Sequence, residues 1–444
     1  MKTRTLTTAL LTLALVLTPW IGVALAQDKA VFIPLLVYRT GPYAPSGIPL
    51  ANGGADYFNL LNERDGGING VKIVFEECET QYDTKQGVEC YERLKNKHGG
   101  AVVVNPYSTG ITYQLIPKAP VDKVVVHSMG YGMTASADGR WFPWVFNFPM
   151  TYWSQASAFV KYVGQQEGGM DKLKGKKIVH IFHNSPYGKE ANPTLEDLAR
   201  RLGFELTLLA VDHPGQEQKA TWLQVRRLNP AWIYISGWGV MNQVAVKEAH
   251  AHGLKMDHVV GNWWTGTEAD VVPAGDGAKG YKSMTFSAPG SGFKVHQDLY
   301  KYVYDKGKGA YGSDWAVRTG EVLYNRMLIN AMFNTEAIRT AMGKYGNKAP
   351  TGEQVRWGYE NLNITEQRLE QLGMKGLIRP VRVSCDNHEG NGMAAVQQWD
   401  GKQWKVVSDW FEPMRDVVRP KLEAAAVEEA KKFNYTMRDC AKEK

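Results

Sequence analysis

Short apolar runs alternate with amphipathic stretches along most of the chain, starting at Val31. The apolar runs are rich in Val, Ile and Leu, which predicts buried strands, and the stretches between them have the apolar spacing of helices. We expect the first strands at 31–37, 71–77, 101–104 and 124–127, with helices that end near 67 and 97. This order is typical of βαβ units around a parallel sheet, and it predicts an α/β fold.

The alternation breaks at Trp141–Met150, an extended stretch with two prolines and five aromatic residues. A second series then begins with a predicted helix at 152–166. Its expected strands lie at 177–183, 204–211, 232–235 and 259–260, and its expected helices at 190–202, 217–228 and 240–252. Two similar halves joined by an extended crossing predict two lobes with a cleft between them, each lobe a parallel sheet flanked by helices.

Two further extended runs, Tyr281–Ala288 and Leu377–Ser384, predict two more crossings between the lobes, with mainly helices from 293 to 372. A hairpin is expected after them, with strands at 394–399 and 404–410. A hinge of three segments allows two lobes to close around a ligand.

The first residues are typical of a secretory signal peptide. Lys2 and Arg4 precede an apolar run, Leu6–Leu17, and Ala24-Leu25-Ala26 offers a small-x-small cleavage site. The run is short for a membrane span, which needs about 20 residues. We therefore expect export, with cleavage near Ala26.

These boundaries predict four parts of the chain. They are a signal peptide at 1–26, lobe I at 27–149 with 286–378, lobe II at 150–285 with 379–411, and a charged helical tail at 412–444.

Four cysteines in an exported chain favour disulfides, and three pairings are possible. Cys78 follows a predicted strand and Cys90 lies in the next helix, so a local Cys78–Cys90 bridge would hold that helix on its strand. Cys385 would then pair with Cys440 and attach the C-terminal tail to the body. Free buried thiols remain the alternative.

The composition is that of a globular chain, with 44% hydrophobic residues, 14 Trp and 21 Tyr. The formal net charge is +7, but the basic residues are spread along the sequence. This spread argues against a nucleic-acid partner.

Five predicted strands lead directly into short loops of glycine, hydroxyl and aromatic residues. The loops lie at 105–110, 128–132, 184–188, 236–239 and 261–266. Ligands of open α/β sheets bind at the carboxyl ends of the strands. Loops with backbone N–H groups, hydroxyls and rings but few charges favour holding a small molecule rather than cleaving it.

The sequence contains no Walker loop and no G-x-S-x-G elbow. His250 and His252 lie near Glu248, but residues two apart on a helix do not share a face. His180 and His183 fall on opposite faces of one strand. We therefore expect no catalytic residue, no metal site and no cofactor, and an exported enzyme is the least favoured interpretation.

Several motifs occur in the order found in one known family. They are Thr40-Gly41-Pro42-Tyr43, Asn62-Glu63-Arg64-Asp65-Gly66-Gly67-Ile68-Asn69-Gly70, Tyr187-Gly188, and Leu228-Asn229-Pro230 before a strand. The chain resembles the type I periplasmic solute-binding proteins of ABC importers, in the branched-chain amino acid (leucine, isoleucine and valine) family. The resemblance covers nearly all of residues 28–411.

The resemblance implies the two-lobed type I periplasmic-binding-protein fold, a periplasmic location, and a ligand held between the lobes. In the family, main chain and hydroxyls of two first-lobe loops bind the ligand's charged groups. The matching positions are Tyr107, Ser108, Thr109, Gly130, Tyr131 and Gly132. Tyr187 matches a tyrosine that covers the ligand from the second lobe, Trp238 falls where the family places another aromatic, and Tyr43 and Trp263 complete the expected site.

Two positions depart from the family pattern. Gly132 stands where a hydroxyl residue is common, and Trp263 stands where amino acid binders tend to carry an acid for the ligand ammonium. Because a buried unpaired ammonium is unfavourable, we expect an aromatic or otherwise apolar carboxylate as the ligand. Aromatic side chains around it would pack on such a flat body.

The leading hypothesis is a periplasmic receptor that closes on its ligand and presents it to the membrane permease and ATPase of an ABC importer. We expect a monomer. One alternative keeps a branched-chain amino acid or small amide as ligand, with Glu268 or a water in place of the missing acid. Another is a ligand-sensing module that hands its closed form to a receptor.

Overall fold

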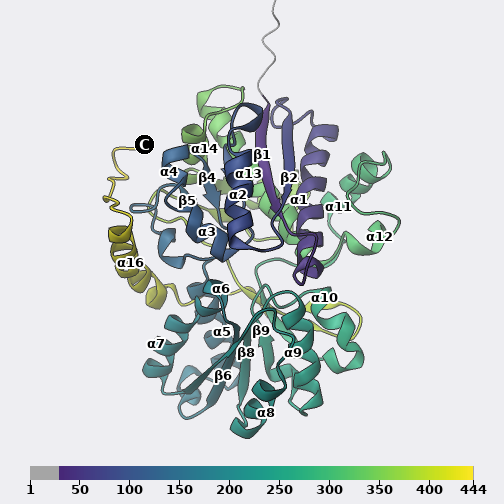
Figure 1. Ribbon diagram of the computed structural model, residues 1–444, viewed down its shortest axis with the longest axis vertical. Helices are drawn as coiled ribbons and strands as arrows, with labels where there is room; N and C mark the ends of the chain where they lie inside the picture. Colours follow the sequence, from purple (N-terminus) through teal and green to yellow (C-terminus); the bar gives the residue numbers. More distant parts are fainter. Residues whose placement is uncertain (1–29, 444) are drawn as a thin grey trace, which may run out of the picture.

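The computed structural model describes residues 30–443, and the predicted signal peptide lies outside these residues. Two β-sheets form the centres of two lobes, seen as the upper and lower halves of Figure 1. Each sheet is flanked by helices, so the predicted two-lobed α/β fold is confirmed.

The first sheet is parallel and belongs to the upper lobe. Its order is β2-β1-β3-β4-β5, because single bridges at Phe32–Ala101 and Leu35–Asn105 join the pair β1–β2 to the other three strands. The strands are β1 (Val31–Val37), β2 (Ile73–Glu79), β3 (Val103–Val104), β4 (Val125–His127) and β5 (Val145–Phe146). Every residue of β1 is buried, as expected for a parallel strand covered on both faces.

Two long helices pack against each other beside this sheet, α1 (Ala44–Arg64) and α13 (Val322–Tyr345). The sheet is also flanked by α2 (Thr84–Leu94), α3 (Thr109–Leu115) and α14 (Gly352–Glu360) (Figure 1). The stretch Val322–Ile338 of α13 is buried throughout, which places both its apolar and its polar side chains inside the protein.

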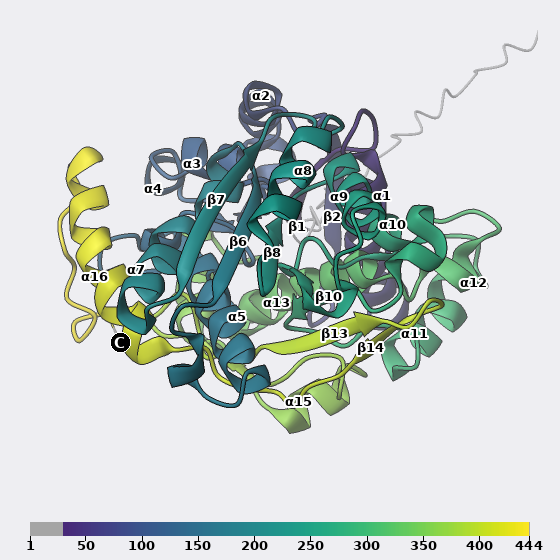
Figure 2. The same ribbon diagram turned by 90° about the horizontal axis from the view of Figure 1, so that it is seen from below.

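The second sheet has seven strands in the order β14-β13-β10-β9-β8-β6-β7. Its parallel part comprises β6 (Lys177–His183), β7 (Glu205–Val211), β8 (Trp232–Ser236), β9 (Val259–Gly261) and β10 (Lys282–Thr285). The antiparallel strands β13 (Ala395–Trp399) and β14 (Trp404–Val406) form the edge opposite β7 (Figure 2). Helices α5 (Tyr152–Gln166), α7 (Asn192–Leu202), α8 (Lys219–Leu228) and α9 (Val240–Ala251) cover this sheet.

The predicted strand at 404–410 is wrong in length, since β14 ends at Val406. The hydroxyl of Ser408 accepts the N–H of Val396 at 2.8 Å, so a side chain replaces the next backbone partner. The predicted lobe boundaries stay a prediction, although the chain does pass between the sheets after β5, after β10 and before β13.

Both predicted disulfides are present, Cys78–Cys90 and Cys385–Cys440. The predicted C-terminal helix is α16 (Arg415–Lys432), which lies along the side of the molecule in Figure 1. Lys421 of α16 donates to the carbonyl of Pro193 in the lower lobe, while Glu423 pairs with Arg140 of the upper lobe at 3.1 Å. None of the helices within 30–443 has the length and apolar character needed to cross a bilayer.

Candidate ligand-binding site

The loops at the carboxyl ends of the strands meet where the two lobes touch. The carbonyl of Gly130, after β4, accepts the indole N–H of Trp263 at 3.2 Å and that of Trp264 at 3.3 Å, both from the loop after β9. Gly130 has φ +66°, and a Cβ there would lie 3.2 Å from the Trp263 ring. Glycine is therefore required both by the turn and by the close approach of the opposite lobe.

A second contact between the lobes involves Tyr43, at the start of α1. Its hydroxyl lies 3.0 Å from Nε2 of His183, the last residue of β6, and 3.0 Å from Nδ1 of His213, which follows β7. The side chain of His183 is fully buried, and burial, with the neighbouring His213, lowers its pKa to about 3. A neutral His183 and the Tyr43 hydroxyl can thus bond without any net charge at this contact.

A third contact is made by Glu190, between the short helix α6 (Pro186–Lys189) and α7. Its carboxylate accepts the Thr134 hydroxyl at 2.7 Å and also the Tyr113 hydroxyl, both from the first lobe. A Cβ at Gly132 would lie 2.5 Å from Oε1 of Glu190. The glycine that departs from the family pattern therefore makes room for this acid, which sequence reasoning did not identify.

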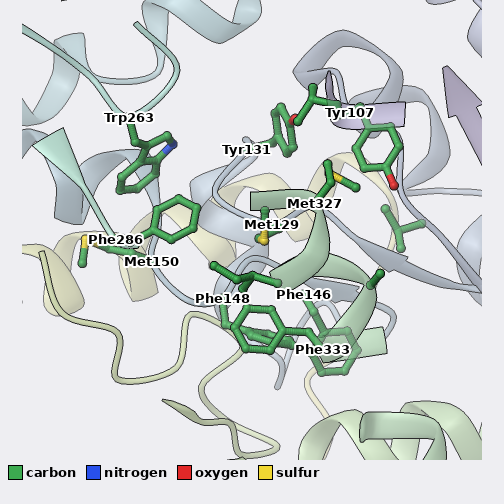
Figure 3. Close-up of a cluster of buried hydrophobic side chains, with 14 of the residues drawn as sticks. Tyr107, Met129, Tyr131, Phe146, Phe148, Met150, Trp263, Phe286, Met327 and Phe333 are labelled. Carbon is green, nitrogen blue, oxygen red and sulfur yellow. The ribbon is translucent and has the colours of Figure 1, made fainter. Parts of the chain in front are cut away.

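Aromatic side chains from both lobes pack together at this interface. The rings of Tyr131 and Trp264 stack with centroids 4.7 Å apart, and Trp238 meets Trp264 edge-on at 5.8 Å. Trp263 packs against Phe286 with ring centroids 5.4 Å apart, and Figure 3 shows these two side chains together. Offset and edge-to-face arrangements of this kind are the geometries that aromatic side chains prefer.

All ten residues expected at the site are buried in this region: Tyr43, Tyr107, Ser108, Thr109, Gly130, Tyr131, Gly132, Tyr187, Trp238 and Trp263. Several of their polar groups already have partners within one lobe. Ser108 caps α3 by accepting the N–H of Ile111 at 3.4 Å, and the N–H of Gly130 donates to the carbonyl of Asn147 at 3.1 Å.

The hydroxyl groups of Tyr187, Tyr43 and Tyr131 differ in whether they have a partner and in which lobe it lies. The hydroxyl of Tyr187 donates to the carbonyl of Gly237 at 2.9 Å within the second lobe. Tyr43 faces His183 rather than the indole pair, but its ring lies 4.6 Å from that of Tyr82. The hydroxyl of Tyr131 has no hydrogen-bond partner among residues 30–443, so it is available to a ligand.

Besides Glu190, a second charged residue at the interface was not expected from the sequence. Arg326 lies near the start of α13 and is fully buried. Its Nη2 donates to the hydroxyl of Thr285 at 3.3 Å, and its guanidinium carbon lies 5.3 Å from the Trp264 ring centroid and 4.9 Å from that of Phe286. Burial lowers the pKa of Arg326 to about 9.

A signal for Arg326 does exist in the sequence. Arg326, Asn330 and Asn334 recur every four residues and therefore share one face of the helix, among the apolar residues of its first half. Such a polar stripe on a buried helix predicts polar partners in the interior. Asn334 has such partners, since its Nδ2 donates to Asn105 and its Oδ1 accepts from Tyr359 at 2.6 Å.

Two acids lie in the same region, Glu268 and Asp270 of the short helix α10 (Glu268–Val271). Glu268 accepts the N–H of Val322 at 3.0 Å at the start of α13, and Asp270 accepts the N–H of Thr267 at 3.0 Å. Burial raises the pKa of Glu268 to about 7 and that of Asp270 to about 8. Both carboxyls are therefore closer to neutral than surface acids at pH 7.

The part of the chain that the structure describes contains no group of three or more His, Cys, Asp or Glu side chains arranged to hold a metal ion. The site combines rings, hydroxyls and backbone groups with titratable groups, namely the guanidinium of Arg326, the carboxyl groups of Glu190, Glu268 and Asp270, and the imidazoles of His183 and His213. These groups can enclose and hydrogen-bond a small molecule.

Comparisons with known proteins identify the family of this chain. The family model of the periplasmic binding proteins matches residues 30–403. A solved structure described as an ABC transporter permease from the Pseudomonas fluorescens group is 43% identical, with a TM-score of 0.86, and the match covers 93% of this chain and 99% of that one. No curated protein sequence matches significantly.

More distant structures share the fold. A branched-chain amino acid ABC transporter protein from Thermus thermophilus with bound valine is 20% identical, with a TM-score of 0.72, covering 88% of this chain and 99% of that one. A solute-binding protein from R. palustris in complex with benzoate is 15% identical, with a TM-score of 0.65, covering 86% and 97%. The family match and the 43% identical structure together show that this chain belongs to the periplasmic binding proteins, the substrate-binding proteins of ABC transporters.

Proposed function

We propose that this protein captures an aromatic or otherwise apolar monocarboxylate between its lobes and delivers it to the membrane permease of an ABC importer. The observation that carries the proposal is the indole of Trp263 at the interface, bonded to Gly130 at 3.2 Å. No ionised acid takes that position, so a ligand ammonium would be buried without a counter-charge. The surrounding rings favour a flat or apolar ligand body.

The ligands of two proteins with this fold support the carboxylate of the proposed ligand. Valine and benzoate, bound by the distant structures named above, both carry a carboxylate, and only valine carries an ammonium. A carboxylate is thus common to the ligands of these two proteins, while the position of Trp263 favours a ligand without the ammonium.

Closure follows from contacts that need both lobes. Trp263, Tyr43 and Glu190 each reach across the interface, and a ligand that touches both lobes binds only the closed form tightly. Such a ligand shifts the population of the two-lobed protein toward closure.

The test is isothermal titration calorimetry of the exported chain with benzoate, 4-hydroxybenzoate, phenylacetate, octanoate, valine and leucine. Small-angle scattering on the same samples measures closure as a fall in the radius of gyration. We expect at least one of the four acids to bind and to compact the protein, and valine and leucine to bind at least tenfold more weakly. Tight binding of valine or leucine without binding of any acid would contradict the proposal.

A further inference from the structure

Arg326 is a charged side chain buried at the lobe interface with most of its donors unused. It has no exposed surface, and among residues 30–443 its Nε and Nη1 have no hydrogen-bond partner. Its one side-chain bond is the 3.3 Å contact from Nη2 to Thr285. A guanidinium carries five N–H donors, so most of its hydrogen-bonding capacity points into the protein without an acceptor.

No acid within residues 30–443 forms an ion pair with this guanidinium, although the charges of Glu268 and Asp270 are near enough to favour its charged form. These two acids bond instead to the backbone N–H groups of Val322 and Thr267. Burial also raises the pKa of both acids, which reduces their negative charge at pH 7. A buried charge without a partner is strongly unfavourable, so its retention calls for an anion from outside the chain.

Arg326 lies beside the aromatic cluster of the lobe interface. Trp264 and Phe286 place their rings 5.3 and 4.9 Å from the guanidinium, and Trp264 in turn stacks on Tyr131. The hydroxyl of Tyr131 is a second buried group without a partner in the described chain. The unpartnered N–H groups of Arg326, on α13, and the unpartnered hydroxyl of Tyr131, after β4, therefore lie around the same aromatic cluster at the lobe interface.

We infer that Arg326 binds the ligand carboxylate through its unpartnered N–H groups and thereby selects anionic ligands that lack an ammonium. This inference rests on the proposed function and names the residue that sets its ligand class. A ligand ammonium placed beside the guanidinium would be repelled, whereas a carboxylate gains charge-assisted hydrogen bonds from it. The rings of Trp264 and Phe286 shield the pair from water, which strengthens the attraction.

The test compares acids with their neutral amides in the wild type, Arg326→Met and Arg326→Lys. The probes are benzoate and octanoate with benzamide and octanamide, titrated calorimetrically, and melting by circular dichroism monitors folding. In Arg326→Met we expect acid affinity to fall about 100-fold while amide affinity changes less than about threefold. We expect Arg326→Lys to lose about tenfold in acid affinity, because it keeps the charge but not the planar fork.

The matched control is Arg339→Met, on the same helix, where Arg339 pairs with Glu336 at 3.0 Å. Its acid affinity should equal that of the wild type. We expect the Tm of ligand-free Arg326→Met to equal or exceed that of the wild type, because an unpaired buried charge is replaced by an apolar chain of similar length.

The possible outcomes distinguish the role of Arg326 from the proposed function. Acid binding by the wild type that survives within threefold in Arg326→Met would overturn the role of Arg326 and leave the proposed function standing. Equal losses for acid and amide would also overturn it, since they indicate a general packing defect. A wild type that binds none of the acids but binds valine or leucine would overturn the proposed ligand class itself.

Discussion

Trp263 donates its indole N–H to the carbonyl of Gly130 at 3.2 Å, across the interface between the two lobes. The residues are 133 positions apart in sequence, and each lies in a loop that follows a strand of its own sheet. Trp264 donates to the same oxygen at 3.3 Å. One carbonyl of the first lobe therefore anchors both indoles of the second, at the place where we propose that the ligand binds.

Replacing Gly130 by alanine should weaken ligand binding more than folding. The backbone at Gly130 has φ +66°, and the new Cβ would lie 3.2 Å from the Trp263 ring. We expect a loss of about 1 kcal/mol in the free energy of unfolding, from backbone strain, and a loss of about tenfold or more in affinity for the bound acid. Urea denaturation and calorimetry measure the two effects.

Gly253→Ala is the matched control, because Gly253 has φ +70° and its Cβ would meet nothing within 4 Å. It should show a similar loss of stability with unchanged affinity. Equal affinities of Gly130→Ala and Gly253→Ala would contradict a role for Gly130 at the interface.

Trp263→Phe should lower affinity for the acid about fivefold. The change removes the N–H donor to Gly130 but keeps a ring beside Phe286, and a net hydrogen bond is worth about 1 kcal/mol. Trp222→Phe serves as control, because Trp222 is equally buried but bonds to Gln218 within the second lobe. A loss in the control as large as in Trp263→Phe would refute the assignment of this indole to the interface.

Stability should decrease in mild acid because of His180. Its ring is fully buried between Asn192 and Ser236, and burial lowers its pKa from 6.5 to about 3. The unfolded chain therefore binds a proton below pH 6.5 that the folded chain does not, and the free energy of unfolding falls as pH decreases from 6.5 toward 3.

Between pH 7 and pH 5 we expect His180 to account for a fall of about 2 kcal/mol in the free energy of unfolding. His180→Gln should remove that part of the fall, as measured by urea denaturation at the two pH values. Between pH 7 and pH 8 the histidine contribution is complete, so neither protein should change on this account. Identical losses in variant and wild type from pH 7 to pH 5 would show that another group is responsible.

The two disulfides should differ in their effect on stability. Cys385–Cys440 closes a separation of 55 residues and Cys78–Cys90 one of 12. Chain entropy predicts losses of up to about 4 kcal/mol for Cys385→Ser with Cys440→Ser, and up to about 3 kcal/mol for Cys78→Ser with Cys90→Ser. Chemical denaturation of the two double variants measures the difference, and a larger loss for the short loop would contradict the entropic ranking.

Much of the architecture could be predicted from local patterns. The helix at 152–166 and the strand at 177–183 have the predicted limits, because each is set by periodicity and by residues next to it in sequence. Thr151, for example, caps α5 by accepting the N–H of Ser154 at 3.3 Å. The predicted strand at 404–410 is too long, because a side-chain acceptor two residues past the end of β14, Ser408, cannot be read from hydrophobicity.

The candidate site was only partly predictable. Loops at strand ends, such as 128–132 and 261–266, follow from the general position of ligands in α/β sheets, and the sequence marks them by their glycines and rings. The sequence does not say which polar groups of a loop are used internally. The N–H of Gly130, predicted to hold an anion, donates to Asn147 in the folded chain.

Local sequence was sufficient to predict the α/β class, the alternation of strands and helices, and a tryptophan at position 263 of the expected site. These depend on residue type and on spacing along the chain. Three contacts became visible only in the folded protein: Arg326 lies against Trp264 and Phe286, Tyr43 contacts His183 and His213, and Glu190 fills the space beside Gly132. These pairs are far apart in sequence, so their contact energies exist only after the lobes have folded and closed, and no local pattern can reveal them.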